Sequence, residues 1–185
     1  ATSCSNCTAG RSSPPGATTC SNCTAGTRSG EGDLCTPCAA GTFSKAGSAD
    51  CTTCEPGRTS NAGASSCFDC PAGKSRADGE ASCSPCGPGT YSEARATTCE
   101  NCERGRFASG QENPACELAG AGYFVATSSA PEQRKCAKGS FSSGSANFEC
   151  TSCEAGKYAD EEGLDACKPA ARGHYVKDEG ATKQE

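Results

Sequence analysis

The cysteines are the residues whose spacing could do chemistry. Nineteen occur in 185 residues, and most form pairs separated by two residues. Thiols at this spacing can close disulfides, bind zinc as thiolates or form a redox centre. The pairs are Cys4/Cys7, Cys20/Cys23, Cys35/Cys38, Cys51/Cys54, Cys67/Cys70, Cys83/Cys86, Cys99/Cys102 and Cys150/Cys153, while Cys116, Cys136 and Cys167 stand alone.

The single cysteines argue against zinc and redox chemistry. A structural zinc site takes four cysteines from two such pairs, and the spacers here are near the required length, but the single cysteines break the groups of four. A thioredoxin-like centre needs one activated pair at a helix N-terminus, not many equivalent pairs in loops. We therefore expect disulfides and neither a metal nor another cofactor.

The composition requires covalent cross-links. Three Leu, two Val and six Phe are the only large aliphatic or phenylalanine side chains. Their share of the chain is far below the roughly 20 % under which a chain is expected to be disordered. Disulfides can replace the missing core, and they persist in secreted and surface proteins. We expect an extracellular or cell-surface location after secretion.

Charge and hydropathy exclude some partners. The net charge of −5 is dispersed along the chain, which does not favour nucleic acid. No apolar run approaches the roughly 20 residues of a membrane helix, so no direct membrane insertion is expected. The sequence starts at Ala1 without a signal peptide, which indicates a processed segment or an excised piece.

An internal repeat of about 16 residues organises the chain. A glycine follows the second cysteine of each pair by three residues, and in most later repeats an aromatic residue follows that glycine by two. Another glycine often lies four residues before the next pair, as expected for a turn. The pattern predicts two short strands joined by a turn, and 23 Gly with 10 Pro disfavour helices. The aromatic positions are Phe43, Tyr91, Phe107, Phe124, Phe141, Tyr158 and Tyr175.

Two repeats lack cysteines at the same two positions. Gly122 places a missing second cysteine at Ala119, and Cys136 places a missing first cysteine at Gln133. The same substitution recurs at Ala170 and Gln184. Two cysteines that are lost together are most simply the two halves of one disulfide.

This co-loss predicts that the second cysteine of each pair bonds the next cysteine along the chain, which leaves Cys4 unpaired. Two alternatives remain. Cysteines could bond within each pair, or the first cysteine of one pair could bond the first of the next and the second could bond the second, but either scheme leaves other cysteines unpaired. The expected disulfides are Cys7-Cys20, Cys23-Cys35, Cys38-Cys51, Cys54-Cys67, Cys70-Cys83, Cys86-Cys99, Cys102-Cys116, Cys136-Cys150 and Cys153-Cys167. The expected segments are tandem modules at 1–116, a disulfide-less module at 117–135, two disulfide-closed modules at 136–169 and a second disulfide-less module at 170–185.

The repeats "CTPCAAGTFSKAGSADC" and "CSPCGPGTYSEARATTC" resemble ephrin-receptor-like cysteine-rich repeats and, more loosely, the smallest modules of tumour-necrosis-factor-receptor ectodomains. The resemblance implies small disulfide-closed β-hairpin modules stacked into an elongated linear rod without a single hydrophobic core. It also implies an extracellular protein, as in surface proteins of algae and protists and in animal receptors.

Catalytic groups are not expected, so we expect no enzyme. His174 is the only histidine, and no nucleophile with a supporting acid can be built on it. The carboxylates Asp160, Glu161 and Glu162, and likewise Asp78 and Glu80, lack the alternating oxygen ligands of a calcium loop. They are typical of solvated turns.

Glycans are the expected covalent partners. Asn6-Cys7-Thr8 and Asn22-Cys23-Thr24 are N-glycosylation sequons at Asn6 and Asn22, although the central cysteine disfavours their use. Ser- and Thr-rich turns such as "RSSPPGATT" suit O-linked sugars, or they are ordinary turn formers.

The apolar stretch "GAGYFVA", echoed by "GHYV", suggests contacts between copies of the chain. The expected contact residues are Tyr123, Phe124, Val125, Tyr175 and Val176, and the alternative is a local cluster that replaces the lost disulfide. Because a linear repeat offers extended surface, we expect a structural protein, a segment of a glycosylated fibril, sheath or surface hair. The alternative is the ligand-binding stalk of a cell-surface receptor.

Overall fold

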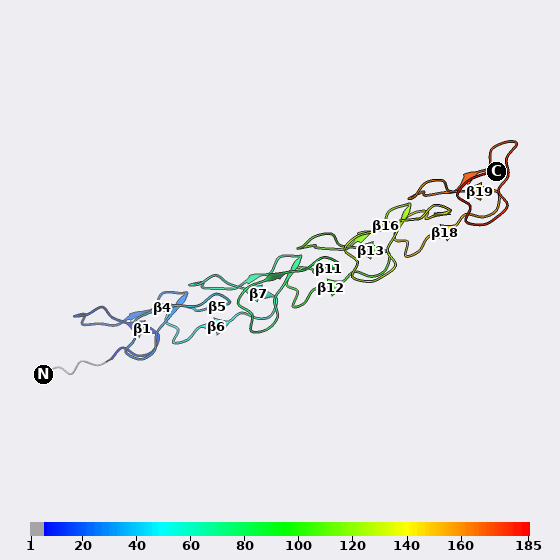
Figure 1. The fold of residues 1–185 in the computed structure, drawn as a ribbon. Coiled ribbons are helices and arrows are strands. Elements are labelled where there is room, and N and C mark those ends of the chain that lie inside the picture. Colours follow the sequence, from blue (N-terminus) through cyan, green and yellow to red (C-terminus); the bar gives the residue numbers. More distant parts are fainter. Residues whose placement is uncertain (1–5) are drawn as a thin grey trace. The chain divides into compact units, whose positions relative to one another are not determined.

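The structure is a computed structural model that describes residues 6–185, and it consists of short antiparallel hairpins (Figure 1). No helix occurs in this range, and each odd-numbered strand pairs with the strand that follows it. The predicted fold class, a disulfide-rich chain of repeated short hairpins, is confirmed. The strands are β1 (Arg11–Ser12), β2 (Ser21–Asn22), β3 (Thr27–Arg28), β4 (Thr36–Pro37), β5 (Thr42–Phe43), β6 (Thr52–Thr53), β7 (Arg58–Thr59), β8 (Phe68–Asp69), β9 (Lys74–Ser75), β10 (Ser84–Pro85), β11 (Thr90–Tyr91), β12 (Glu100–Asn101), β13 (Arg106–Phe107), β14 (Glu117–Leu118), β15 (Tyr123–Phe124), β16 (Arg134–Lys135), β17 (Ser140–Phe141), β18 (Thr151–Ser152), β19 (Lys157–Tyr158) and β20 (Lys168–Pro169).

Each hairpin belongs to one module. A module starts at the second-cysteine position, reaches the repeat glycine three residues later and places its first strand directly after that glycine. Its second strand is the two-residue spacer of the next cysteine pair. We number the modules in chain order, starting at Cys7, Cys23, Cys38, Cys54, Cys70, Cys86, Cys102, Ala119, Cys136, Cys153 and Ala170. The last module has no strand, and Tyr175 and Glu185 exchange backbone hydrogen bonds at 3.1 and 3.0 Å where the other modules have their hairpin.

The repeat glycine joins its module to the next one. In module 3, the Gly41 N–H donates to the Ser60 carbonyl, and the Gly41 carbonyl accepts from the Cys54 N–H, both at 2.9 Å. Gly41 has a φ of 79°, in the left-handed region that favours glycine. A Cβ on Gly41 would also lie 3.0 Å from the carbonyl oxygen of Ala81, two modules away. A glycine is therefore required for two reasons, the backbone angle and the close approach.

The turn residue, four residues before the next first cysteine, closes the junction from the other side. The Gly63 N–H of module 4 donates to the Cys38 carbonyl of module 3 at 2.8 Å. Modules 6 to 9 have no glycine at this position, so residue type does not mark the turn residue there. Their turn residues still adopt left-handed angles, which are 64° at Arg95, 60° at Glu112, 57° at Ser129 and 62° at Ala146.

The buried side chains lie at the junctions instead of in one core. Second cysteines make up most of the buried hydrophobic residues in the described range. The residue three positions after the repeat glycine, here called the core position, is also buried in modules 2 to 11, whereas the aromatic residue before it is mostly half-buried. The buried core positions are Ser29, Ser44, Ser60, Arg76, Ser92, Ala108, Val125, Ser142, Ala159 and Val176.

The chain divides into two compact units. Among the described residues, one comprises residues 6–84 with 93–98, and the other comprises residues 85–92 with 99–185. This division follows packing, whereas the four segments expected from the sequence are defined by cysteine content.

Candidate functional site

Nine disulfides close the modules, and they join the same cysteines that the co-loss argument pairs. The Cα atoms of bonded cysteines lie 5.6–5.8 Å apart. The second cysteines are buried at the junctions, while the first cysteines are half-buried. The closed pairs are Cys7–Cys20, Cys23–Cys35, Cys38–Cys51, Cys54–Cys67, Cys70–Cys83, Cys86–Cys99, Cys102–Cys116, Cys136–Cys150 and Cys153–Cys167. Cys4, expected to be unpaired, lies outside the described residues.

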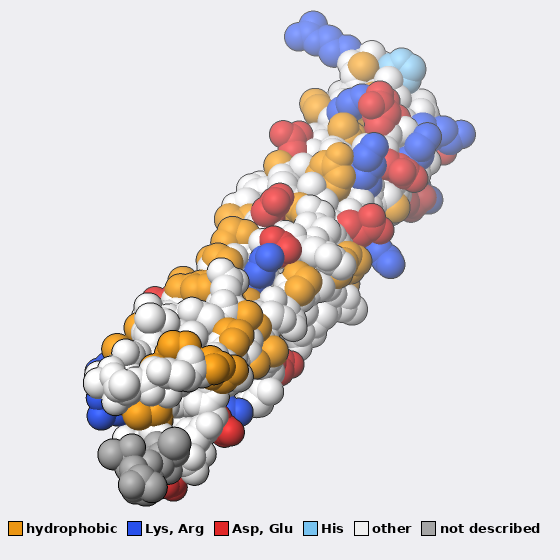
Figure 2. All heavy atoms as spheres, turned by 90° about the vertical axis from the view of Figure 1, so that its left-hand side faces the viewer, with side chains coloured by type: hydrophobic (Ala, Val, Ile, Leu, Met, Phe, Trp, Pro, Cys, Tyr) orange, Lys and Arg blue, Asp and Glu red, His pale blue; other side chains and the backbone are white. Residues whose placement is uncertain are grey.

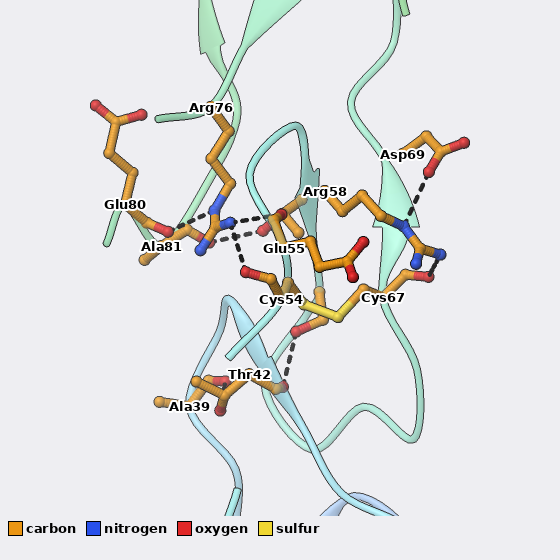
Figure 3. The surroundings of a disulfide bond; sticks show 12 residues. Ala39, Thr42, Cys54, Glu55, Arg58, Cys67, Asp69, Arg76, Glu80 and Ala81 are labelled. Atoms are coloured by element: carbon orange, nitrogen blue, oxygen red, sulfur yellow. Dashed lines mark hydrogen bonds and ion pairs between the residues drawn. A yellow bond between two sulfur atoms is a disulfide. The ribbon is translucent and has the colours of Figure 1, made fainter. Parts of the chain in front are cut away.

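The surroundings of one disulfide show how the buried polar groups of a junction are hydrogen-bonded (Figure 3). Arg76 fills the core position of module 5 and is only 1 % exposed. Its guanidinium donates to the carbonyls of Cys54 at 3.1 Å, Glu55 at 3.0 Å and Glu80 at 2.5 Å. Backbone carbonyls therefore compensate a buried cation that has no carboxylate partner among these contacts.

Serine at the core position forms the same kind of link. The Ser44 Oγ donates to the Thr27 carbonyl of the preceding module at 2.9 Å, and the Ser60 Oγ donates to the Thr42 carbonyl at 2.8 Å. The core position is the main feature that the sequence analysis missed. Its residues share only moderate size and burial, whereas the neighbouring aromatic residues gave the stronger pattern.

The two modules without a disulfide use a glutamine amide in its place. In module 8, the Gly120 N–H donates to Gln133 Oε1 at 2.7 Å. In module 11, the Ala171 N–H donates to Gln184 Oε1 at the same distance. The glutamines stand where a first cysteine would be, and each binds the residue after the missing second cysteine. A hydrogen bond therefore closes the same loop that a disulfide closes elsewhere.

An apolar cluster also supports module 8. Phe107 from module 7 packs with Ala119, Val125 and Ala130, and each is at most 9 % exposed. This is the local cluster that the sequence analysis gave as an alternative to contacts between copies. Val125 and the equivalent Val176 are 2 % and 7 % exposed, so both are used inside the chain.

The expected contact surface thereby narrows to three aromatic residues. Tyr123 and Phe124 are half-buried in β15, whereas Tyr175 is 59 % exposed. A hydrogen bond with Glu185 raises the pKa of Tyr175. Figure 2 shows hydrophobic side chains in separate groups between charged ones on the face drawn.

Both candidate glycosylation residues are accessible. Asn6 is exposed, and Asn22 is exposed at the end of β2. The central cysteine of each sequon is already bonded within its module, because Cys7 pairs with Cys20 and Cys23 pairs with Cys35. Both asparagines are therefore exposed next to a closed disulfide, with their amide groups beside Gly32 and Gly47.

The polar groups weighed for catalysis or metal binding lie on the surface. His174 is exposed, and its Nδ1 lies 3.1 Å from the Glu185 carbonyl oxygen. Lys168 Nζ lies 2.7 Å from Asp160 Oδ1, and this hydrogen bond lowers the pKa of Asp160 and raises the pKa of Lys168. Across residues 6–185, no three His, Cys, Asp or Glu residues are arranged to hold a metal ion.

Part of the chain matches a known protein family. Residues 139–185 match the family described as tyrosine-protein kinase ephrin type A/B receptor-like. This stretch runs from the repeat glycine of module 9 through module 11, so it includes one of the modules closed by glutamine. No curated protein matches the chain. In the part of the chain that the structure describes, no helix is long and apolar enough to cross a membrane.

Proposed function

We propose that this array of ephrin-receptor-like, cysteine-rich repeats is a structural segment of an extracellular filament, sheath or surface hair. Its nine disulfides and the family match fit an extracellular protein, and repeats of this family are a non-catalytic kind of domain. The filament assembles from copies of the chain and carries N-linked and O-linked glycans. The chain acts through its surface and not through an enclosed site.

The observation that carries this proposal is the repeated backbone junction. Gly26, Gly105 and Gly139 each donate an N–H to the core carbonyl of the next module at 2.9 Å. Side chains at the surface can change without loss of these bonds, because the donors and acceptors belong to the backbone. Such an array provides length and many equivalent surface positions, as a structural polymer requires.

The glycans would lie on the same surface. Asn6 and Asn22 occupy equivalent positions in the spacers of successive cysteine pairs, and both are exposed. Sugars at these positions, with O-linked sugars in the Ser- and Thr-rich turns, would keep neighbouring chains apart except at the contact residues. We assign the apolar contact between copies to Tyr123, Phe124 and Tyr175.

Negative-stain electron microscopy and sedimentation velocity of the oxidised chain test the proposal. We expect filaments or sheets, and a Phe124→Ser variant that folds but assembles less. Phe68→Ser is the matched control, because Phe68 is 49 % exposed and lies outside the proposed contact. Dispersed monomers at all concentrations would contradict the proposal and support the alternative, a receptor stalk.

A further inference from the structure

Residue types recur in every third module, a longer period than the module itself. One element is an aromatic residue between two hydroxyl residues after the repeat glycine, and the other is a Glu and a basic residue in the next module. The first element is GTFS at 41–44, GTYS at 89–92 and GSFS at 139–142. The second element is CEPGR at 54–58, CERGR at 102–106 and CEAGK at 153–157.

The structure brings the two elements together. Tyr91, Glu103 and Arg106 line one groove of about 330 Å³, together with Glu100 and Asn101 from the spacer of the cysteine pair between them. Phe141, Glu154 and Lys157 line a second groove of about 190 Å³ at the same repeat positions. In both grooves the ring is half-buried, while the carboxylate and the cation are exposed.

The first copy of the pattern carries the same set of side chains. Phe43 and Arg58 are half-buried, and Glu55 is exposed. Arg58 Nε lies 2.9 Å from Asp69 Oδ1, and Arg58 also donates to the Cys67 carbonyl at 2.8 Å (Figure 3). We call the two grooves, the one at Tyr91 and the one at Phe141, the paired grooves.

The fold itself does not require this recurrence. Thr59 and Ser75 occupy the aromatic position in modules 4 and 5, and their modules keep the hairpin. Residues between the recurring ones have also changed, since Pro56, Arg104 and Ala155 stand between the Glu and the glycine. The recurrence therefore points to a surface that is used once in every three modules.

We infer that the paired grooves bind the paired grooves of a second copy of this chain. Each groove offers one carboxylate and one cation beside a ring, and in the second groove Lys157 Nζ lies 3.8 Å from Glu154 Oε2. Two grooves related by a twofold axis can exchange such an exposed pair for Glu-to-basic-residue pairs between the copies, in both directions. Both grooves lie in the same compact unit, so a second copy presents them at the same spacing and two weak contacts add up. This inference rests on the proposed function and adds a polar contact between copies to the apolar one assigned to Tyr123, Phe124 and Tyr175.

Charge reversal tests the inference by sedimentation velocity. We expect Glu103→Lys with Glu154→Lys to weaken self-association about tenfold or more, because the ion pairs become repulsive. Arg106→Glu with Lys157→Glu should have the same effect. An equimolar mixture of the two variants should regain association, since each presents the charge that the other lacks. This rescue also shows that both variants are folded.

The control is Glu93→Lys with Glu162→Lys, the same change of charge at exposed residues outside the grooves. Its self-association should equal that of the unchanged chain. If the unchanged chain associates but both groove variants behave like the control, or if the mixture fails to regain association, the inference is overturned while the proposed function stands. If the unchanged chain does not associate at all, the proposed function and this inference both fail.

Discussion

Modules 7 and 8 share a backbone and differ in how their loops are closed. Arg106 pairs with Leu118 in module 7, and Tyr123 pairs with Lys135 in module 8, at equivalent positions. The N–H at the second-cysteine position donates to the preceding repeat glycine in both modules, from Cys102 to Gly89 and from Ala119 to Gly105, at 2.9 Å. Of these two modules, only module 7 has a disulfide.

The comparison separates two effects of a disulfide. The hairpin and the junction are determined by backbone hydrogen bonds, because they are the same with and without the cross-link. The disulfide instead restricts the unfolded chain, which in the chain-entropy model is worth about 3 kcal/mol for a loop of this size. Module 8 has a hydrogen bond and an apolar cluster in its place, so its geometry is retained while its resistance to opening should be lower.

Tryptic cleavage should show the difference as an all-or-none effect. Arg134 and Lys135 are exposed and lie outside every disulfide loop, so cleavage there separates two large fragments without reduction. Cleavage at a basic residue inside a closed loop, such as Arg95, leaves the pieces joined. We expect non-reducing gels to show fragments that end at Arg134 or Lys135. A variant with Gln at both positions should stay in one large piece, and large fragments from any other site would contradict the pairing.

Removal of one disulfide should destabilise a closed module more than any other change short of full reduction. With Cys102→Ala and Cys116→Ala, module 7 loses its cross-link and has no glutamine to replace it. We expect its opening free energy to fall by about 3 kcal/mol. Native-state hydrogen exchange at the Gly105 amide measures this, and the Gly41 amide in the other unit is the internal control. Unchanged protection at Gly105 would show that the disulfide contributes little.

The opposite substitution should close module 8. Ala119→Cys with Gln133→Cys places cysteines where the register matches that of the bonded modules, so a disulfide should form. The expected gain is about 2 kcal/mol, because about 3 kcal/mol from the cross-link is offset by about 1 kcal/mol for the lost hydrogen bond. Exchange at the Gly122 amide and non-reducing peptide mapping measure it. Ala119→Ser with Gln133→Ser is the control without a cross-link, and free thiols in the first variant would contradict the equivalence.

The glutamine alone should have a smaller effect. Gln133→Leu keeps the approximate size of the side chain but removes the acceptor of the Gly120 N–H. We expect a loss of about 1 kcal/mol in module 8, measured by exchange at Gly122. Gln133→Glu retains an acceptor oxygen and should lose less. Equal losses in both variants would indicate that packing and not the hydrogen bond closes the loop.

The hairpin fold and the disulfide pairing could be predicted from the cysteine spacing. A disulfide needs both of its cysteines, so the two are kept or lost together. The sequence contains Gln133 and Gln184, but it does not reveal their hydrogen bonds. Each glutamine accepts from a backbone N–H, a group that does not depend on the residue type of the donor. The left-handed backbone angles at Arg95 and Ser129 could not be predicted from residue type for a similar reason. Their conformation is imposed by a hydrogen bond to the preceding module and not by glycine.

The smallest expected effect is electrostatic and concerns module 10. The hydrogen bond from Lys168 lowers the pKa of Asp160 below its ordinary 3.8, so its contribution to stability is present above that pH and is lost as the pH falls through the lowered value. The pKa of Lys168 is raised above 10.5, so its contribution is present below that pH and is lost as the pH rises through the raised value. The side chains of Lys168 and Asp160 are 42 % and 40 % exposed, and Glu161 lies 3.9 Å from the same ammonium, so the contribution to stability is small. An NMR titration of the Asp160 carboxyl should show its midpoint rise in Lys168→Ala and stay unchanged in Lys183→Ala. An unchanged midpoint in Lys168→Ala would mean that the ion pair is absent in solution.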